Sequence, residues 1–293
     1  MTQSRYLLKQ SDFNETRQRV WRPVVPTYGP AKHAGSRTEN ALLAKLSERI
    51  KQIERPTATV HGVLPFGITA TDRALPGGGL ARGALHEILG AGRDEEDGAL
   101  AAAFAAYILG RLTGTADGIV LWCLPRPDLY GPGLAAHGLD PARVVLVRAP
   151  RDAEILWAME EGLHAPGIVA VVGEVGTLPG IASRRLQLAA EHSGTTAFLL
   201  RRWRDGGQAA HERALPNAAV TRWRIAALPS RPMPGEPGVG HPRWQIELLR
   251  CRGGEPVCWE MEVPDATDHV SLAAALADRP AAPVTPEKLR RAG

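Results

Sequence analysis

The strand-like stretch Gly83-Ala-Leu-His-Glu-Ile-Leu-Gly90 runs directly into Ala91-Gly92-Arg93-Asp94-Glu95-Glu96-Asp97-Gly98. A strand of this kind, ending in glycine, is typical of the entry to a phosphate-binding loop. Such a loop has Gly, Lys and Ser or Thr at the fifth, sixth and seventh places after its first glycine, so that N–H groups and one ammonium hold the phosphates. Those places hold Glu95, Glu96 and Asp97. We therefore predict a loop, with the remnant positions Gly90, Glu95, Glu96 and Asp97, that binds no nucleotide.

The acidic run argues against a triphosphate on electrostatic grounds. Each pair of like unit charges at ~4 Å costs about 1 kcal/mol in water and about 4 kcal/mol at an effective dielectric constant of about 20. Residues 94–97 carry four consecutive carboxylates. The run is either a solvated loop whose only requirement is to bind no phosphate, or an acidic docking patch.

Strands and helices alternate around this loop, which predicts parallel strands joined by crossover helices. The expected strands are 84–89, 118–123, 144–148, 168–173 and 195–200, and the expected helices are 99–112, 153–163 and 181–192. Unbroken apolar strands belong in a sheet covered on both faces. Later strands at 219–227, 244–251 and 257–263 are expected to extend it in antiparallel order. The predicted fold class is α/β, with a mostly parallel central sheet.

The length of 293 residues predicts one main domain, which we place at 61–265, with appendages at both ends. Residues 1–40 show no clear period and are predicted to form an irregular or disordered arm. Residues 41–60 are predicted to be an amphipathic helix and linker, which either docks on its own domain or binds a partner. Residues 266–293 are predicted to hold a short helix at 270–277 and a flexible tail.

Composition is that of a globular protein, with 44% hydrophobic residues, 23% charged residues and a net charge of +4. The three cysteines have no zinc or disulfide spacing, so we expect no metal and a reducing compartment. The N-terminus lacks a signal-peptide core, and no apolar run is long enough for a membrane span. These features predict a cytoplasmic protein.

The stretch 64–83, with Pro76-Gly-Gly-Gly-Leu80 ahead of the strand, resembles the entry to a RecA-type recombinase core. Later segments match in order. Residues 118–125 resemble the second core strand, 168–173 the Walker B strand, and 195–201 the strand that ends at a sensor residue. The similarity covers roughly 61–265, and it implies a RecA-like fold with helices on both faces of the sheet.

Each catalytic place of the active recombinases is changed in this chain. Glu96 and Asp97 stand where the active proteins have the lysine and threonine of the loop, and Pro125 stands where they have a catalytic carboxylate. Gly173 stands at the place of the acid that supports the metal ion, and Glu174 follows it by one residue. Arg201 stands at the place of the sensor glutamine. Because the losses agree with one another, we predict no catalytic residues, no cofactor and no ATP hydrolysis. An active ATP-dependent recombinase is the enzymatic alternative.

Two further stretches, Leu121-Trp-Cys-Leu-Pro-Arg-Pro-Asp-Leu-Tyr-Gly-Pro-Gly-Leu134 and Val171-Val-Gly-Glu-Val175, resemble the ImuA family of RecA-like accessory proteins. The resemblance implies induction by DNA damage and an adaptor role in mutagenic translesion synthesis. It implies work beside a Y-family-like protein, ImuB, and an error-prone replicative-type polymerase, with RecA and DNA as further candidate contacts. A SulA-type inhibitor of cell division shares a reduced RecA-like architecture and is a second alternative.

A basic segment at 201–224 occurs where recombinases keep a mobile DNA-contacting loop. It carries six arginines against two carboxylates, with Trp203 and Trp223 interleaved. Guanidinium groups on phosphates and an aromatic ring on a base are typical of single-strand binding. The DNA-binding candidates are Arg201, Arg202, Trp203, Arg204, Arg213, Arg222 and Arg224. The alternative is a charged sheet edge with tryptophan packed on arginine stems.

Arg250 and Arg252 are interface candidates because residues two apart on a strand share a face. In recombinase filaments the matching places hold lysines that reach a neighbour's nucleotide. We expect this face either to meet a carboxylate of another RecA-like subunit, such as the run at 94–97, or to be a fixed surface pair.

Overall fold

The computed structural model describes residues 60–92, 94–203, 206–231, 241–262 and 271–275. All of them belong to the second of the chain's two compact units, Lys51–Gly293. The predicted arm at 1–40 and nearly all of the predicted helix and linker at 41–60 lie outside the described residues.

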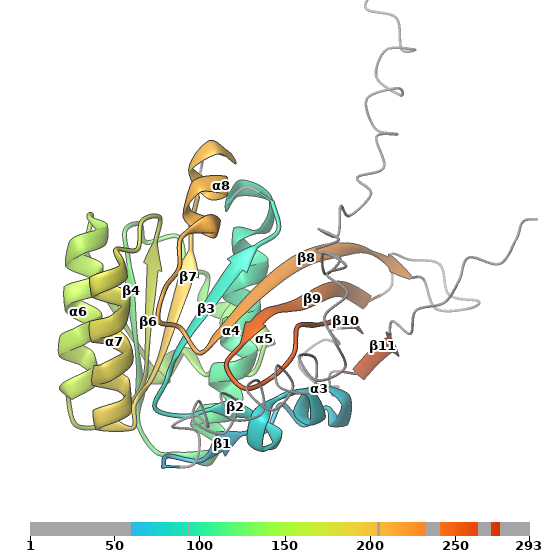
Figure 1. Ribbon diagram of the computed structural model, residues 1–293, viewed down its shortest axis with the longest axis horizontal. Coiled ribbons are helices and arrows are strands. Elements are labelled where there is room, and N and C mark those ends of the chain that lie inside the picture. The colour runs from blue at the N-terminus through green and yellow to red at the C-terminus, as the bar shows by residue number, and fades with distance from the viewer. Residues whose placement is uncertain (1–59, 93, 204–205, 232–240, 263–270, 276–293) are drawn as a thin grey trace, which may run out of the picture. The chain divides into compact units, whose positions relative to one another are not determined.

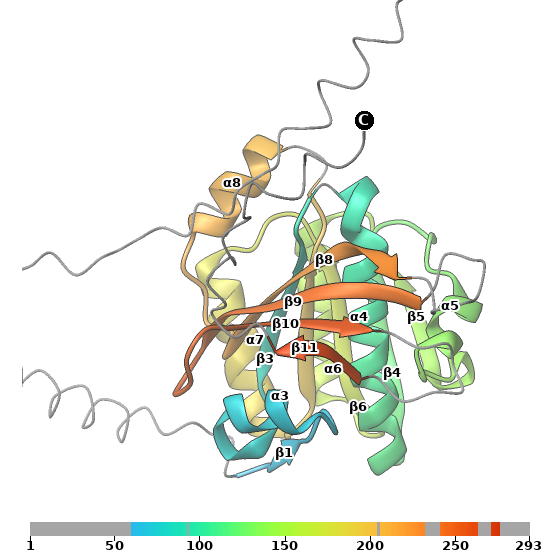
Figure 2. The same cartoon turned by 90° about the vertical axis from the view of Figure 1, so that its right-hand side faces the viewer.

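A nine-stranded sheet organises this unit, in the order β11-β10-β9-β8-β3-β7-β6-β4-β5 (Figures 1 and 2). Its parallel part consists of β3 (Leu85–Gly90), β4 (Ile119–Leu124), β5 (Val144–Arg148), β6 (Ile168–Val175), β7 (Thr196–Arg201) and β8 (Thr221–Arg231). The antiparallel extension consists of β9 (His241–Cys251), β10 (Val257–Glu262) and β11 (Ser271–Ala275). The predicted fold class is confirmed. The strand expected at 219–227 differs from the prediction, because the chain returns after β7 to the end of the sheet where β3 begins, so that β8 pairs in parallel with β3 and is antiparallel only to β9.

Helices cover both faces of the parallel strands (Figure 1). One face packs α6 (Asp152–His164) and α7 (Gly180–Ser193), and the other packs α4 (Asp94–Thr115) with α5 (Gly131–Ala136) beside it. The short helix α8 (Gly206–Ala214) lies beyond the carboxyl ends of β3 and β7 (Figure 1). The entry to the core holds β1 (Val63–Leu64), α3 (Thr69–Ala74), the 3₁₀ turn Pro76–Gly78 and β2 (Leu80–Ala81); a second 3₁₀ turn, Pro141–Arg143, precedes β5.

Two hydrophobic cores follow from this layering, one on each face of the sheet. On the α4 face, the Trp223 ring lies 5.5 Å from Phe66, 5.6 Å from Phe104 and 6.1 Å from Trp259 between ring centroids. Trp223 is fully buried. Aromatic rings at these separations add to the stabilisation that burial alone gives.

The acidic run departs from the loop that the sequence predicts. Helix α4 begins at Asp94, five residues before the predicted start at 99, so the carboxylates form its first turn. Negative side chains are favourable there, because the helix dipole and the free N–H groups make this end positive. Strand β6 likewise runs two residues beyond its predicted end and includes Glu174.

The helix predicted at 270–277 is wrong, since residues Ser271–Ala275 form a strand. Its sequence, Ser-Leu-Ala-Ala-Ala, favours a helix by intrinsic propensity. In the structure this segment pairs antiparallel with β10, from Glu262 opposite Ser271 to Trp259 opposite Ala275. Pairing along an otherwise open sheet edge therefore outweighs the local preference.

A buried polar chain joins β3 to β8 beneath the core. The Trp223 indole N–H donates to Thr221 Oγ1 at 2.7 Å, and the Thr221 hydroxyl lies 2.8 Å from Nδ1 of His86. Nε2 of His86 lies 2.8 Å from the Ala81 carbonyl oxygen, which can only accept, so Nε2 carries the proton. Complete burial lowers the pKa of His86 from 6.5 to about 4, against the raising effect of the Ala81 hydrogen bond.

This lowered pKa predicts loss of stability in mild acid. The unfolded chain takes up a proton at His86 as pH falls below 6.5, whereas the folded protein does not do so until about pH 4. The free energy of unfolding therefore decreases as pH falls through this range. The expected decrease in the free energy of unfolding over that window is on the order of 3 kcal/mol. Chemical denaturation at a series of pH values measures it. His86→Leu should be less stable at neutral pH yet lose this part of the pH slope, and an unchanged slope would contradict the assignment.

Candidate functional site

The remnant phosphate loop holds its own carboxylate on its backbone. The Gly92 N–H donates to Oδ2 of Asp97 at 2.5 Å, from one turn into α4. Gly90 permits this close return, because a Cβ there would lie 2.8 Å from Cβ of Asp97. The Asp97 carboxylate thus occupies a loop donor that an external anion would need.

Two other N–H groups of the loop are also used by the protein. The Ala91 N–H donates to the Ile225 carbonyl of β8 at 2.8 Å, and the Asp94 N–H donates to the Trp203 carbonyl at 3.1 Å. Phosphate binding by such a loop depends on free N–H groups that point at the ligand. Here the donors at 91, 92 and 94 have internal acceptors.

An arginine occupies the space in front of the loop. The Arg202 guanidinium, just past β7, forms ion pairs with Asp94, with Glu174 at 2.8 Å and with Asp128 at 3.2 Å. Arg126 adds a second cation, 3.1 Å from Asp94 and 3.4 Å from Asp128. We call these five residues the Arg202 cluster. It joins the start of α4, the loop after β4, strand β6 and the segment after β7.

Glu174 is the most deeply buried acid of the Arg202 cluster, with 1% of its side chain exposed. Its Oε1 accepts the Trp122 indole N–H at 2.9 Å, and its Oε2 accepts from Arg202. Burial raises the pKa of Glu174, while Arg202 and the Trp122 hydrogen bond lower it. The Arg202 pKa is raised on balance, because attraction to Glu174 and Asp94 outweighs the cost of burying its charge. The guanidinium is therefore the counter-ion that this buried carboxylate requires.

Gly173 occupies the place where the recombinase pattern has an acid, and packing explains the absence of a side chain. A Cβ at Gly173 would collide with the Met159 sulfur of α6 and lie 3.1 Å from Ile155. The following residue, Glu174, belongs to the opposite face of β6, toward Trp122. A side chain at 173 would therefore require Met159 of α6 to move away from β6.

A second set of ion pairs, the Glu87 cluster, lies beneath α8. Glu87 of β3 accepts from Arg222 at 2.5 Å and from the Asn217 amide at 2.9 Å, and Arg201 lies 3.7 Å away. Arg201 also pairs with Glu212 of α8 at 2.6 Å. The Glu87 cluster, defined as Glu87, Arg201, Glu212 and Arg222, ties α8 to the ends of β3, β7 and β8.

The two tryptophans of the basic segment are not placed for stacking on bases. Trp203 is 3% exposed, and the guanidinium groups of Arg201 and Arg213 lie over its ring, 5.0 and 5.3 Å from its centroid. Its indole N–H donates to the Gly176 carbonyl at 2.7 Å. Trp223 belongs to the core. The structure therefore favours the alternative of tryptophan packed against arginine.

The remaining basic candidates also contact their own chain. Arg213 donates to the carbonyls of Gly90 and Ala91 at 3.1 and 3.2 Å, and Arg224 pairs with Glu247 of β9 at 2.5 Å. Arg204 lies outside the described residues. The structure thus brings Arg201, Arg202, Arg213 and Trp203 together around the remnant loop and α8, and it places Arg224 on the β8–β9 pair.

Arg250 and Arg252, the interface candidates, converge on one segment of their own chain. Arg250 donates to Oδ1 of Asn217 at 2.7 Å and to the Ala219 carbonyl at 2.8 Å, and Arg252 donates to the Ala218 carbonyl at 3.4 Å. Burial, followed by repulsion from Arg222, lowers the pKa of Arg250. Asp94, their proposed acidic counterpart, is only 4% exposed and already paired.

Two hollows of different size lie beside the Arg202 cluster. One of about 220 Å³ is lined by Arg202, Glu174, Asp94 and Arg126, with Pro125 at its side. A larger groove of about 550 Å³ runs from Asp94 and Arg202 between α4 and α5 to Trp244.

Within the described residues, no group of three or more His, Cys, Asp or Glu side chains could hold a metal ion. None of the described helices is both long and apolar enough to span a bilayer.

The fold and the site together define an α/β core with a mostly parallel sheet, in which the backbone donors of the remnant loop are satisfied internally. The chain is 42% identical over 216 residues to Protein ImuA of Caulobacter vibrioides strain NA1000 / CB15N, which covers 73% of this chain and 88% of that protein. The same values hold for Protein ImuA of strain ATCC 19089 / CIP 103742 / CB 15. The chain belongs to the ImuA family, as the sequence resemblance predicted.

No model of a protein family matches the chain. Among solved structures, the RadB recombinase aligns with a TM-score of 0.45 at 14% identity, over 69% of this chain and 96% of that one.

Several residues of the site are missing from the predicted set. Arg126, Asp128, Glu87 and Glu212 acquire their roles mainly through partners distant in sequence, such as Arg202 for Asp128, although Arg126 also lies 3.4 Å from Asp128. The stretch Leu124-Pro-Arg-Pro-Asp128 carries the only local signal, since it places two charges just after a buried strand. Its prolines indicate a fixed loop, but they do not identify the partner of either charge.

The Arg202 cluster predicts a large cost for removing its central cation. Arg202→Met leaves Glu174 buried without its counter-ion, and breaking a buried pair costs about 3–5 kcal/mol of unfolding free energy. Adding Glu174→Gln, which still accepts from Trp122, should recover much of the loss. Denaturant unfolding of the two single variants and the double variant measures the coupling.

The matched control is Arg185→Met, which breaks the exposed pair of Arg185 and Glu160 between α7 and α6 and should cost about 0–1 kcal/mol. The Arg202→Met deficit should also be smaller near pH 5 than near pH 8. The pKa of Glu174 is raised by burial, so this carboxyl favours the folded state at low pH, where it is protonated. That contribution to the free energy of unfolding is lost as pH rises and the carboxyl becomes a buried charge without Arg202. Equal costs for Arg202→Met and Arg185→Met would contradict the role of the cluster.

Proposed function

We propose that this protein is a non-enzymatic accessory protein of DNA damage-induced mutagenic translesion synthesis, acting in the cytoplasm as an adaptor. Membership of the ImuA family supports the process, through a relative that covers most of the chain. The remnant loop supports the absence of enzymatic activity, because its place for phosphate is filled by the protein's own charges. The RecA-like core is then a rigid scaffold for contacts.

The observation that carries this proposal is the position of Arg202. Its guanidinium lies among Asp94, Asp128 and Glu174, directly beside the loop where a nucleotide-binding core would hold phosphates and a metal. To admit a nucleotide, the protein would have to separate three ion pairs and leave Glu174 buried and unpaired. Separating a buried pair of this kind is costly. An active ATPase is therefore the weaker alternative.

The proposed role of the protein is to bind partners rather than to catalyse a reaction. We infer that the principal partner is an ImuB-type Y-family-like protein, and that RecA, the error-prone polymerase and single-stranded DNA are secondary partners. The described arginines of 201–224 are bound to carboxylates or carbonyls of their own chain. Their internal partners favour protein contact over DNA contact as the main role. The antiparallel extension formed by β9, β10 and β11 distinguishes this chain from the reduced core expected of a SulA-type division inhibitor.

Genetic and biochemical readouts together test the proposal. Deletion of the gene should lower the frequency of damage-induced mutation, and the wild-type chain and Glu96→Ala should restore it equally, since no loop side chain takes part in chemistry. Purified wild-type protein should hydrolyse ATP at the background rate with single-stranded DNA present. Hydrolysis above background that Glu96→Ala abolishes would show an active enzyme. Unchanged mutation frequency in the deletion strain would remove the proposed process.

A further inference from the structure

Strand β5 forms one edge of the sheet and has an open side. It pairs in parallel with β4, from Val120 opposite Val144 to Leu124 opposite Arg148. Within the part of the chain that the structure describes, no strand lies on its other side. Natural proteins usually protect such an edge with proline, lysine, a bulge or a covering element. The strand Val144-Val-Leu-Val-Arg148 contains no proline or lysine.

The backbone of β5 directs hydrogen-bonding groups away from the sheet. The Ala149 N–H donates to the Leu124 carbonyl of β4 at 3.1 Å. Because strand geometry alternates with a period of two, Val145 and Val147 share that inward direction, while Leu146 and Arg148 direct their N–H and C=O groups outward. The Val144 N–H bonds to the Pro141 carbonyl. The open side thus offers the donors of Leu146 and Arg148.

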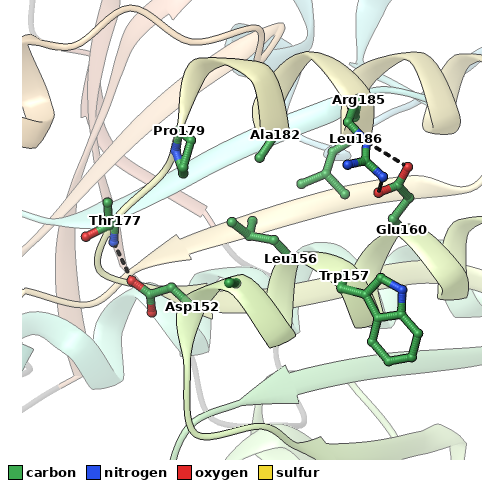
Figure 3. Close-up of a pocket in the computed structure, with 10 residues that line it drawn as sticks. Asp152, Leu156, Trp157, Glu160, Thr177, Pro179, Ala182, Arg185 and Leu186 are labelled. Atoms are coloured by element: carbon green, nitrogen blue, oxygen red, sulfur yellow. Dashed lines mark hydrogen bonds and ion pairs between the residues drawn. The ribbon is translucent and has the colours of Figure 1, made fainter.

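Apolar side chains accompany these groups on both faces of the edge. Val145 is 45% exposed and Leu146 is 51% exposed. Trp157 of helix α6 is 63% exposed, and it lines with Leu156 and Leu186 the groove shown in Figure 3. An unpaired backbone between exposed apolar side chains is the combination that an added strand covers.

Charge identifies the kind of strand that fits. Arg148 is exposed at the end of β5, and within the described residues no hydrogen bond or ion pair engages its side chain. Arg151, close by, already pairs with Glu154 of α6. A strand laid along β5 with a carboxylate near Arg148 would neutralise the free cation, and guanidinium–carboxylate pairing would fix its register.

A partner segment fits this edge better than a second copy of the chain. The strand β5 is five residues long, and an edge of that length buries far less than the ~1,200–2,000 Å² of a stable protein interface. Two copies paired through β5 would also leave both Arg148 groups without a carboxylate from the strand itself. An extended peptide gains affinity from main-chain hydrogen bonds over a short length.

We propose that β5 is a docking edge that accepts an extended segment of a partner protein as an additional strand. That segment carries apolar side chains on both faces, over Val145 and Leu146, and a carboxylate that pairs with Arg148. The inference rests on the proposed adaptor role, for which it specifies the surface and the chemistry of the contact.

The test uses full-length protein and the full-length ImuB-type protein encoded in the same genome as the probe, with affinity measured by calorimetry. Leu146→Pro removes an outward N–H without removing a bond to β4, so folding is retained and the edge is blocked. It should weaken binding at least about tenfold, because one main-chain hydrogen bond is lost and the proline ring obstructs the added strand. Leu146→Thr, which keeps the N–H, should bind within about threefold of wild type, because the backbone supplies most of the affinity.

Further variants and a hydrogen-exchange measurement distinguish the possible outcomes of this test. Ile181→Thr, at an apolar side chain of α7 that is 80% exposed, is the matched surface control and should leave affinity unchanged. Arg148→Glu should weaken binding, and the amides of Leu146 and Arg148 should become protected from hydrogen exchange in the complex. Leu146→Pro binding like wild type would overturn the docking edge while leaving the adaptor role intact. A dimer of the chain alone that Leu146→Pro disrupts would overturn it in favour of self-pairing. Failure of wild-type protein to bind would instead contradict the proposed function.

Discussion

The ion pairs of Arg202 are the constraint around which this end of the fold is arranged. One guanidinium compensates the buried Glu174 and also reaches Asp94 and Asp128, so it connects four segments of the chain that are distant in sequence. A buried charge without a partner is strongly unfavourable, whereas a compensated one is tolerated. The carboxylates at the remnant loop can therefore be retained only while the arginine stays among them. The backbone donors at 91, 92 and 94 of the loop are likewise engaged by acceptors within the protein.

The neighbouring Glu87 cluster extends this arrangement to α8. Arg201 and Arg222 hold Glu87 and Glu212, and Arg213 reaches the carbonyls of the loop itself. A segment that is strongly basic in sequence is thus largely neutralised within its own chain. Its arginines position α8 and the loop, and two of them lie over the ring of Trp203. Net charge per segment is a poor guide to surface potential when the compensating acids come from other strands.

The sequence predicts the sheet well because the signals for it are local. Apolar runs predict the edge strand β5 at its observed bounds, 144–148, and predict β3, β4, β6 and β7 within about two residues. The failed predictions depend on tertiary context. The Ala-rich segment at 271–275 is a strand because β10 offers an edge, and Asp94 begins a helix because carboxylates suit its first turn. The partners of Arg202 come from β6, α4 and the loop after β4. No periodicity records such pairings.

The central claim is that the protein's own charges occupy the nucleotide site. Its most direct test is thermal unfolding of the full chain across a series of Mg-ATP concentrations, with magnesium sulfate at matched ionic strength as the control for ionic effects. A ligand that binds only the folded state raises Tm in a saturable, concentration-dependent way. The account predicts the same Tm with Mg-ATP as with the control at every concentration up to the millimolar range. A saturable rise with Mg-ATP alone would show that Arg202 and Asp97 give way to nucleotide, and would contradict it.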